Sequence, residues 1–351
     1  MLESIFIEFF ADLGSSFSNP QKRIFIGYLF CALAIGVAWL ILKQDHSIKT
    51  ACAKILSKHI WLSKSSLLDY RVFVLNKIIS ILFAPILLSH LAIATSLFLW
   101  LHNIFPSRPT LLAEHTVWIG SLLFTMTYFI LDDFAKFYIH RLMHKLPILW
   151  AFHKVHHSAE TLTPITVFRA HPIEIILFSF RSSVVQALCI ASFIFFFGDN
   201  ITLTSVLGAN IFIFIFNLLG SNLRHSHIAI PYWKSIEKIF ISPAQHQIHH
   251  SVEPRHHDKN FGVTLAIWDV LFSSHHHSEK NQQLTFGLTQ NKKTNQSLKE
   301  LYFNPCTEAL TLIKTRFITI KQLIRSRYQS SSKKTTYPSC ANNNTHTNTN
   351  T

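Results

Sequence analysis

The chain has 351 residues, of which 49% are hydrophobic and only 14% are charged, and its formal net charge is +14 at pH 7. Ordinary soluble domains carry about 25% charged residues, so this chain has too little polar surface to be a water-soluble enzyme. Its five cysteines are scattered without a Cys-x-x-Cys motif, which excludes a disulfide framework of the secreted kind. These numbers favour an integral membrane protein.

Five long apolar runs explain this composition. They cover residues 24–42, 78–101, 117–139, 173–197 and 201–219. A soluble helical protein would show apolar residues at a spacing of about 3.6, which leaves one face of each helix polar. A helix needs about 20 apolar residues to cross the hydrocarbon core of a bilayer, so we expect four to five membrane spans.

Lysine and arginine are distributed unevenly between the segments that connect these runs. Segment 43–77 holds seven of them, whereas segment 102–116 holds only Arg108. Segments 140–171 and 222–351 are basic as well, so the positive-inside rule places all three basic segments in the cytoplasm. The predicted fold is an all-α, polytopic membrane helical bundle of four to five spans with a cytoplasmic histidine-rich cap. Such a multi-pass protein would lie in the inner membrane of a bacterium or in the endoplasmic reticulum of a eukaryote.

The same pattern divides the chain into three parts. Residues 1–116 are predicted to form N-terminal membrane and interfacial helices, because residues 48–62 place apolar side chains on one helical face and lysines on another. Residues 117–277 contain the densest histidine clusters and form the predicted catalytic domain. Residues 278–351 form a polar, basic C-terminal tail, and its Asn/Thr-rich end is typical of disordered segments.

Three short motifs concentrate eight histidines. They read HRLMH at 140–144, HKVHH at 153–157 and HQIHH at 246–250. On a helix, residues three and four apart share one face, so each motif presents its imidazoles together. Imidazole binds Fe, Zn and Cu strongly, and eight nitrogens exceed the roughly four to six positions around one ion. The spacing therefore predicts a site for two metal ions side by side.

The residues between these histidines exclude the commonest hydrolytic alternative. A zinc hydrolase of the His-Glu-x-x-His type needs a glutamate general base, but Arg141 and Lys154 occupy the equivalent positions. The chain has no Gly-x-Ser-x-Gly, Walker A or Gly-x-Gly-x-x-Gly motif, and no cysteine lies inside a histidine motif. A nitrogen-rich, redox-active site for two metal ions remains, with iron as the first candidate.

These motifs and the segments around them resemble the fatty acid hydroxylase / sterol desaturase superfamily of integral membrane di-iron proteins. The matching segments are LDDFAKFYIHR before the first motif, TVFRAHPIE at 166–174, LRHSHI at 223–228, SPAQHQIHHS at 242–251 and DKNFGVTLAIWDVLF at 258–272. The resemblance ends at Ser273-Ser274, where members usually have Gly-Thr. It implies a hydroxylase or desaturase that uses O2 and two electrons on a fatty acyl chain or a sterol-like substrate.

The resemblance also implies cofactors and partners. Two Fe ions would form the di-iron cofactor, O2 would be the co-substrate, and a membrane lipid would be the substrate. Because the chain shows no flavin or nucleotide motif, electrons would come from a separate donor, such as a cytochrome b5-like protein, a ferredoxin or a flavoprotein. The basic cytoplasmic segments would attract such acidic carriers, and no nucleic acid partner is expected.

Carried over position by position, the resemblance assigns nine histidines as metal ligands. They are His140, His144, His153, His156, His157, His225, His246, His249 and His250. His225 lies outside the three motifs but matches a position where members commonly have an additional histidine. His171 and His257 are either auxiliary ligands or hydrogen-bonded structural residues.

Two polar residues are candidates for a catalytic or orienting role. Asp133 lies seven residues before His140 on the same helical face, so its carboxylate would orient that imidazole through the second ring nitrogen, unless it pairs with a nearby lysine. Asn260 is the second candidate, although a structural role is favoured for it. Glu174 and Arg181 are expected to pair with each other inside the bundle, because lone charges within a membrane are costly.

The leading functional hypothesis is a membrane-bound di-iron lipid hydroxylase or desaturase. The alternative is a metal-binding or transporting membrane protein without oxygenase activity. An ion path would place histidines in the middle of spans, whereas these histidines cluster at the ends of the apolar runs. A catalytically silent scaffold of the same fold is a third hypothesis, and the complete histidine motifs count against it.

Overall fold

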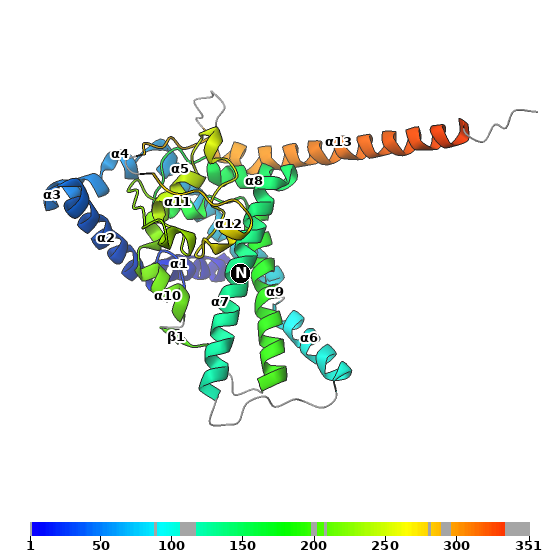
Figure 1. Ribbon diagram of the computed structural model, residues 1–351, viewed down its shortest axis with the longest axis horizontal. Coiled ribbons are helices and arrows are strands. Elements are labelled where there is room, and N and C mark those ends of the chain that lie inside the picture. Colours follow the sequence, from blue (N-terminus) through cyan, green and yellow to red (C-terminus); the bar gives the residue numbers. More distant parts are fainter. Residues whose placement is uncertain are drawn as a thin grey trace, which may run out of the picture.

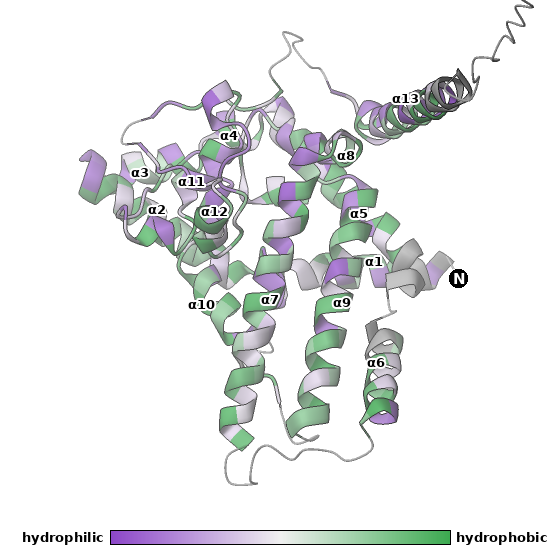
Figure 2. Ribbon diagram, turned by 45° about the vertical axis from the view of Figure 1, so that its right-hand side comes forward, coloured by the Kyte–Doolittle hydropathy of each residue, from purple (hydrophilic) through white to green (hydrophobic). Residues whose placement is uncertain are grey.

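The computed structural model is helical throughout its described part, apart from one hairpin of two short strands. The described residues are 2–87, 90–105, 117–197, 202–206, 209–279, 282–288 and 296–333. Long apolar helices extend from one side of the molecule, and short helices and turns form a more polar cap at one end of them (Figure 1, Figure 2). The prediction of an all-α fold is confirmed.

Three helices in the described part of the chain are long and apolar enough to cross a membrane. They are α2 (Ile26–Gln44), α7 (Val117–Lys145) and α9 (Pro172–Phe197). With 29 residues, α7 is about 43 Å long at 1.5 Å per residue, which is enough to cross a whole bilayer. α7 and α9 run side by side, and their most apolar parts lie away from the cap (Figure 2). These helices support the predicted membrane bundle.

The described residues of the apolar run 78–101 belong to two helices. They are divided between α5 (Lys64–Leu87) and α6 (His90–Ile104), and residues 88 and 89 lie outside the described part. α6 packs along α9, so this run still contributes to the apolar bundle.

The apolar run 201–219 is also not a single span. Its only described helix is α10 (Ile211–Leu218), which is about 12 Å long and follows the strands β1 (Ser205–Val206) and β2 (Ala209–Asn210). The Asn210 side chain caps α10 by accepting a bond from Phe212 N at 3.0 Å, so the helix begins only there. The prediction of a continuous fifth span is therefore wrong.

Proline and serine residues mark the starts of the cap helices. α8 (Pro147–His157) and α11 (Pro243–His249) both begin with proline, whose fixed φ suits the first helical position and whose missing N–H costs nothing there. Ser242 caps α11, because its hydroxyl accepts a bond from Gln245 N and the Gln245 side chain accepts one from Ser242 N. The other cap elements are α3 (Ile48–Ile55), α4 (Lys58–Trp61), α12 (Ile267–Leu271), η2 (Pro164–Phe168), η3 (Ser221–Arg224), η4 (Ile236–Lys238) and η5 (Pro254–His256).

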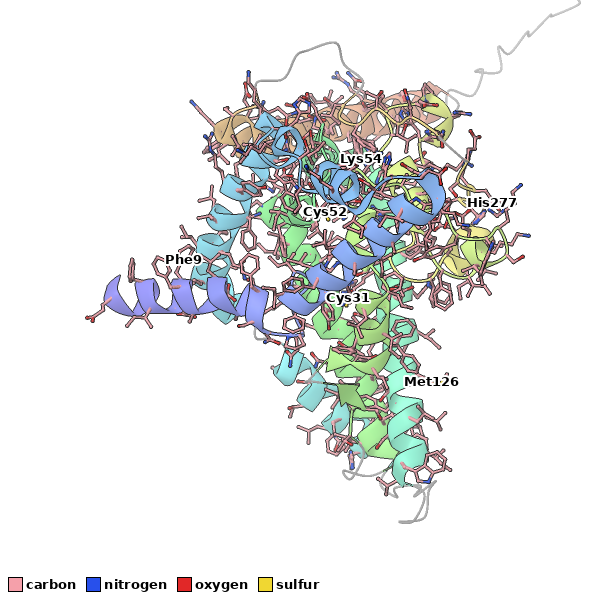
Figure 3. The ribbon with its side chains drawn as sticks, turned by 90° about the vertical axis from the view of Figure 1, so that its left-hand side faces the viewer. Phe9, Cys31, Cys52, Lys54, Met126 and His277 are labelled. Carbon is pink, nitrogen blue, oxygen red and sulfur yellow. The ribbon has the colours of Figure 1, made fainter. Side chains whose placement is uncertain are left out.

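Two further helices run across the direction of α7. α1 (Leu2–Ser18) is tied to α5 by an ion pair of 2.7 Å between Lys77 and Asp12, and it projects from the side of the bundle (Figure 3). α13 (Leu298–Lys333) starts against α8 and extends away from the cap (Figure 1). Met126 of α7 and His277 of the cap lie far apart along the bundle (Figure 3).

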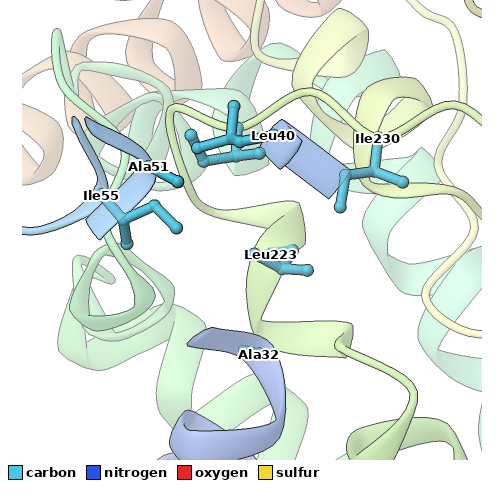
Figure 4. Close-up of a cluster of buried hydrophobic side chains, with 7 residues drawn as sticks. Ala32, Leu40, Ala51, Ile55, Leu223 and Ile230 are labelled. Atoms are coloured by element: carbon cyan, nitrogen blue, oxygen red, sulfur yellow. The ribbon is translucent and has the colours of Figure 1, made fainter. Parts of the chain in front are cut away.

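A buried apolar cluster joins the N-terminal helices to the cap (Figure 4). Its members are Ala32, Leu40, Ala51, Ile55, Leu223, Ile228 and Ile230. α2 and α3 supply the first four of these residues, and Leu223 belongs to η3, two residues before His225. Burial of these side chains from water or lipid headgroups therefore fixes the position of the segment that carries this histidine.

A buried ion pair fastens α5 to the end of α8. Arg169 Nη1 lies 2.8 Å from Asp69 Oδ1, and both side chains are almost inaccessible. The same guanidinium donates through Nε to Val155 O at 3.2 Å and to the Ser158 hydroxyl at 3.1 Å. These acceptors lie at the C-terminal end of α8, where helical carbonyls lack partners within the helix. The pair therefore holds the end of a helix that carries three histidines.

Replacing Arg169 with Ala should lower the free energy of unfolding by about 3–5 kcal/mol, because the Asp69 carboxylate would remain buried without a counter-ion. Thermal unfolding of the purified protein in detergent, followed by circular dichroism, measures the loss. Lys145→Ala is the matched control, since its 2.6 Å ion pair with Asp258 is largely exposed and should contribute little. Equal unfolding midpoints for the two variants would contradict the expected effect.

Candidate metal centre

Four segments of the chain bring nine histidines together. α7 supplies two from the first motif, α8 supplies three from the second, and α11 with the residue that follows it supplies three from the third. His225 follows η3 directly and is the ninth. Eight of the nine rings are buried, and His144 is half-buried.

The histidines form two adjacent clusters, in each of which one candidate ligand atom per residue lies within 4.8 Å of all the others. The five-histidine cluster contains His140, His144, His153, His157 and His249, and the four-histidine cluster contains His156, His225, His246 and His250. The structure thus brings together all nine histidines that were predicted as ligands. His225 belongs to the smaller cluster, where its Nε2 lies 3.2 Å from His156 Nε2 and 3.0 Å from His246 Nε2.

The repeated His-x-x-His-His spacing has a geometric explanation. In the 153–157 motif, the first and last histidines join the five-histidine cluster and the middle one joins the four-histidine cluster. In the 246–250 motif the assignment is reversed. Each of these motifs therefore serves both clusters, because positions i and i+4 are almost aligned on a helix while position i+3 points to one side. A single cluster would not need this arrangement.

Backbone carbonyls fix the orientation of two rings in the five-histidine cluster. His140 Nδ1 donates to Phe261 O, and His249 Nδ1 donates to Lys259 O, each at 2.8 Å. A carbonyl accepts only, so the proton of each neutral ring lies on Nδ1 and its Nε2 lone pair is free to bind a metal. Such outer partners are the usual means of fixing the tautomer of a ligating imidazole.

Several buried ring nitrogens have no hydrogen-bond partner among the residues that the structure describes. Nε2 lacks a hydrogen bond in His144, His153, His157 and His249, all of the five-histidine cluster, and His250 lacks one at both nitrogens. Buried polar atoms are normally satisfied, because an unpaired one costs the free energy of its lost hydration. Unpaired nitrogens that converge within a few ångströms fit metal ions, and the nitrogen-only donor set suits Fe or Zn.

Burial also keeps these rings in the protonation state that a metal requires. It lowers the pKa of His153 to about 3 and that of His156 to about 4. The pKa values of the other cluster histidines in the cap are lowered in the same direction by burial, as found for His157, His225, His246, His249 and His250. The rings are therefore neutral at pH 7, so no proton has to leave before a metal binds.

Asp133 does not contact the His140 ring, so the prediction that it orients this imidazole directly is wrong. Its carboxylate accepts bonds from the backbone N–H groups of Thr264 and Leu265 and from Trp268 Nε1, each at 3.0 Å. Thr264 and Leu265 lie in the loop whose earlier residue Phe261 holds His140, and Trp268 lies in α12 directly after that loop. Asp133 therefore supports His140 indirectly, through the loop. Its carboxylate accepts hydrogen bonds from backbone N–H groups of the loop, whereas the Nδ1 proton of His140 is donated to Phe261 O.

Asn260 lies behind the same loop in a structural position. Its backbone has a positive φ of 56°, and its amide donates to the carbonyls of Gln245 and His276 at 3.1 and 3.0 Å. All of its described side-chain bonds go to backbone groups, so the catalytic role proposed for it finds no support. Asp269 completes the loop by accepting bonds from Phe261 N and from Gly262 N, at 2.8 and 2.7 Å.

Glu174 and Arg181 do not pair with each other, contrary to expectation. Arg181 binds Asp132 at 2.6 Å, and Glu174 Oε1 lies 2.9 Å from His153 Nδ1. The pattern missed this contact because Glu174 and His153 belong to different helices. The sequence held one signal for this contact: a glutamate at the start of an apolar helix, close in the chain to the histidine motif at 153–157.

The two histidines predicted as auxiliary ligands or structural residues, His171 and His257, lie outside both clusters. His171 Nε2 donates to Tyr302 O at 3.0 Å and so ties the start of α9 to α13. His257 lies on the wall of a cavity of about 360 Å3 that reaches both clusters. The cavity is lined by His144, Trp150, His157, His249, His250, Ser251, Val252, His257, Asp258, Gly287 and Leu288. This mostly polar cavity gives small molecules access to the candidate metal positions.

Replacing His225 with Ala should remove about one of two bound metal ions, because it leaves only three histidines in the smaller cluster. Elemental analysis of the purified, iron-reconstituted protein measures the ratio. His171→Ala, which removes a buried ring outside both clusters, should retain both ions. Two tightly bound ions in His225→Ala would show that this residue is structural.

The metal-free protein should lose stability as the pH falls from about 6.5 towards 4. Histidines of the unfolded chain bind protons near pH 6.5, whereas the buried rings of His153 and His156 resist protonation down to about pH 3 and 4. The unfolded state therefore binds more protons in this window, and unfolding becomes easier as pH decreases. Unfolding midpoints at several pH values test this, and a flat profile across the window would contradict it.

Comparisons with known proteins agree with this geometry. Residues 125–274 match the family model described as fatty acid hydroxylase. The chain is 30% identical over 157 residues to alkylglycerol monooxygenase of Xenopus tropicalis, which is 45% of this chain and 31% of that protein. It is 29% identical over 168 residues to the Homo sapiens alkylglycerol monooxygenase, covering 48% of this chain and 33% of that protein.

A bacterial relative is the ornithine lipid hydroxylase of Rhizobium tropici, 26% identical over 161 residues, or 46% of this chain and 44% of that protein. The chain thus spans about a third of the length of the alkylglycerol monooxygenases that it matches. No solved structure matches it. The matched region contains all nine clustered histidines, and through it the chain is similar to the fatty acid hydroxylase family.

Proposed function

We propose that this protein is a membrane-bound, O2-dependent lipid hydroxylase with two iron ions as its cofactor. The observation that carries the proposal is the pair of adjacent clusters of five and four buried, neutral histidines. The nine nitrogens together exceed what one ion can coordinate, and the two clusters lie against each other as a two-metal site requires. The similar proteins named above are hydroxylases or monooxygenases, which favours hydroxylation over desaturation.

The nine histidines would hold the two irons, which supply the O2 activation that attack on an unactivated C–H bond requires. The carbonyls of Phe261 and Lys259 orient two of the ligand rings, so that their Nε2 atoms face the metal position. Burial excludes bulk water from the other ring nitrogens. The 360 Å3 cavity beside His144 and Trp150 leaves an approach to the metals for O2 and for the reacting part of a substrate.

The substrate class is a lipid with a long hydrocarbon chain and a polar headgroup. A second cavity, of about 200 Å3, lies between α2, α3, α4 and the segment around η3, and its lining is almost entirely apolar. Dry cavities of about 150 Å3 are known to bind small hydrocarbons, so this one is large enough for part of an alkyl chain. The relatives are named for alkylglycerols and for ornithine lipids, and both kinds of lipid combine such chains with polar headgroups.

Electrons would come from a separate protein, because the sequence has no flavin or nucleotide motif. A cytochrome b5-like protein, a ferredoxin or a flavoprotein would serve, and the basic cap would favour an acidic carrier. The half-buried His144 and Trp150 have ring centroids 5.0 Å apart. Both residues line the polar cavity of about 360 Å3, beside the candidate metal centre.

Expression of the protein in a host that lacks it should produce lipids about 16 mass units heavier than their precursors in air, and about 18 units heavier when 18O2 is supplied, because the added oxygen atom comes from O2. Lipid extracts analysed by mass spectrometry measure the product. His144→Ala should abolish it, since this ring belongs to the five-histidine cluster and lines the approach. A product two mass units lighter would indicate desaturation, and metal binding without any lipid product would favour a metal-binding or transport role.

The histidine cap should face the cytoplasm, as the distribution of lysine and arginine requires. In a cysteine-free background, cysteines at Glu160 and Lys238, both exposed on the cap, should react with a membrane-impermeant thiol reagent only after cells are opened. A cysteine at Asn103, exposed at the end of α6, should react in intact cells. The reverse pattern would invert the proposed topology.

A further inference from the structure

Glu174 is the carboxylate that touches the histidine clusters. Within the described part of the chain, its contact with His153 is the one hydrogen bond between an acidic side chain and any of the nine clustered rings. Glu174 Oε1 lies 2.9 Å from His153 Nδ1, and the two side chains are 7% and 3% exposed. The comparable bonds of His140 and His249 end on neutral backbone carbonyls. Among the described residues, His153 is thus the one ring of its cluster whose outer partner is an acidic side chain.

The position of Glu174 is built into the start of α9. Pro172 begins the helix, and Glu174 lies in its first turn, where unpaired backbone N–H groups favour negative charge. Ile173 N donates to His171 Nδ1 at 3.2 Å, which secures the approach of the chain to this turn. The glutamate is therefore delivered to His153 by a rigid element rather than by a loose loop.

The second oxygen of Glu174 lacks a partner among the described residues. Oε2 is buried and has no hydrogen-bond partner. A buried carboxylate with an unpaired oxygen is costly unless a cation compensates it. Among the described residues, no lysine or arginine forms an ion pair with Glu174, so a metal ion bound to the opposite nitrogen of the His153 ring would supply the missing positive charge.

We propose that Glu174 is a positioning residue that makes one of the two metal sites electronically distinct. Its carboxylate holds His153 with Nε2 directed into the five-histidine cluster and gives this ligand partial anionic character. An ion in that cluster is thereby bound more tightly and held more strongly in its higher charge state than its neighbour. This inference rests on the proposed two-metal function, and it assigns the asymmetry to a residue outside the three histidine motifs.

A purely structural role predicts a different result. If Glu174 merely ties α9 to α8, then Glu174→Gln should be silent, because the amide oxygen still accepts the bond from His153 and the shape is almost unchanged. If the negative charge matters, the same variant should alter the metal site while the fold remains intact. The glutamine variant therefore separates the two roles, whereas Glu174→Ala removes both.

The test uses the full-length protein, stripped of metal and reloaded with Co2+, whose visible absorption reports its coordination. Wild type, Glu174→Gln and Glu174→Ala are titrated with a chelator, and the iron-loaded forms are examined by redox titration. Glu237→Gln is the control, because Glu237 is equally buried but binds Ser242 Oγ at 2.8 Å and Ser278 N at 3.1 Å, and none of the nine rings.

In Glu174→Gln, one of the two cobalt ions should bind about 10- to 100-fold more weakly, with a changed spectrum for that ion alone. The reduction potential of one iron should rise, and the unfolding midpoint of the metal-free protein should stay near that of wild type. Glu237→Gln should show the wild-type affinities, spectrum and potentials.

Three outcomes would overturn the inference. Identical cobalt binding and potentials in wild type and Glu174→Gln would reduce Glu174 to a structural tie, while leaving the two-metal proposal intact. Equal weakening of both ions would indicate a general disturbance of the fold. A wild-type protein that binds no metal under any reloading condition would defeat the proposed function and this inference together.

Discussion

Nine imidazole rings share a small buried volume, and each of them needs a partner for its nitrogens. This requirement governs the rest of the structure. Water cannot reach most of these atoms, and the rings are neutral because burial disfavours their charged forms. Metal ions can satisfy the nitrogens that face inward, but the outward nitrogens have to be held by the protein. The loop around Phe261 and the glutamate at the start of α9 meet that second demand.

The supports of the clusters come from segments far apart in the sequence. Asp133 of α7 holds the loop that binds His140. Arg169 donates a hydrogen bond to the end of α8 and forms an ion pair with Asp69 of α5. The N-terminal helices α2 and α3 pack against η3 and so restrain the segment that carries His225. Residues outside the region that matches the family therefore help to build the site, which explains why a helix as distant as α2 belongs to the same compact unit.

The sequence predicted which histidines come together, because helical geometry leaves little freedom once histidines lie three and four residues apart. It could not predict how the second and third motifs divide their rings between two clusters, since that depends on the angle at which α8 and α11 meet. The partners of Asp133 and Glu174 were also missed, because both carboxylates bind groups on other elements. Hydropathy predicted α2, α7 and α9 as long helices but failed for residues 201–219, where Asn210 and the hairpin before it start a new and shorter helix.

The same arrangement couples metal binding to folding. The five-histidine cluster takes its rings from α7, α8 and α11, and the four-histidine cluster takes its rings from α8, the segment after η3, and α11 with the residue that follows it, so each cluster forms only when three elements have packed together. Without metal, the packed state has to keep several ring nitrogens unpaired. Protons do not bind to these nitrogens at neutral pH in place of a metal, because burial lowers the pKa of the rings. Binding energy from the metals is therefore available to stabilise the packed state and is lost when it opens. The buried Arg169–Asp69 pair and the apolar cluster of α2, α3 and η3 would keep the clustered histidines close together in the absence of metal.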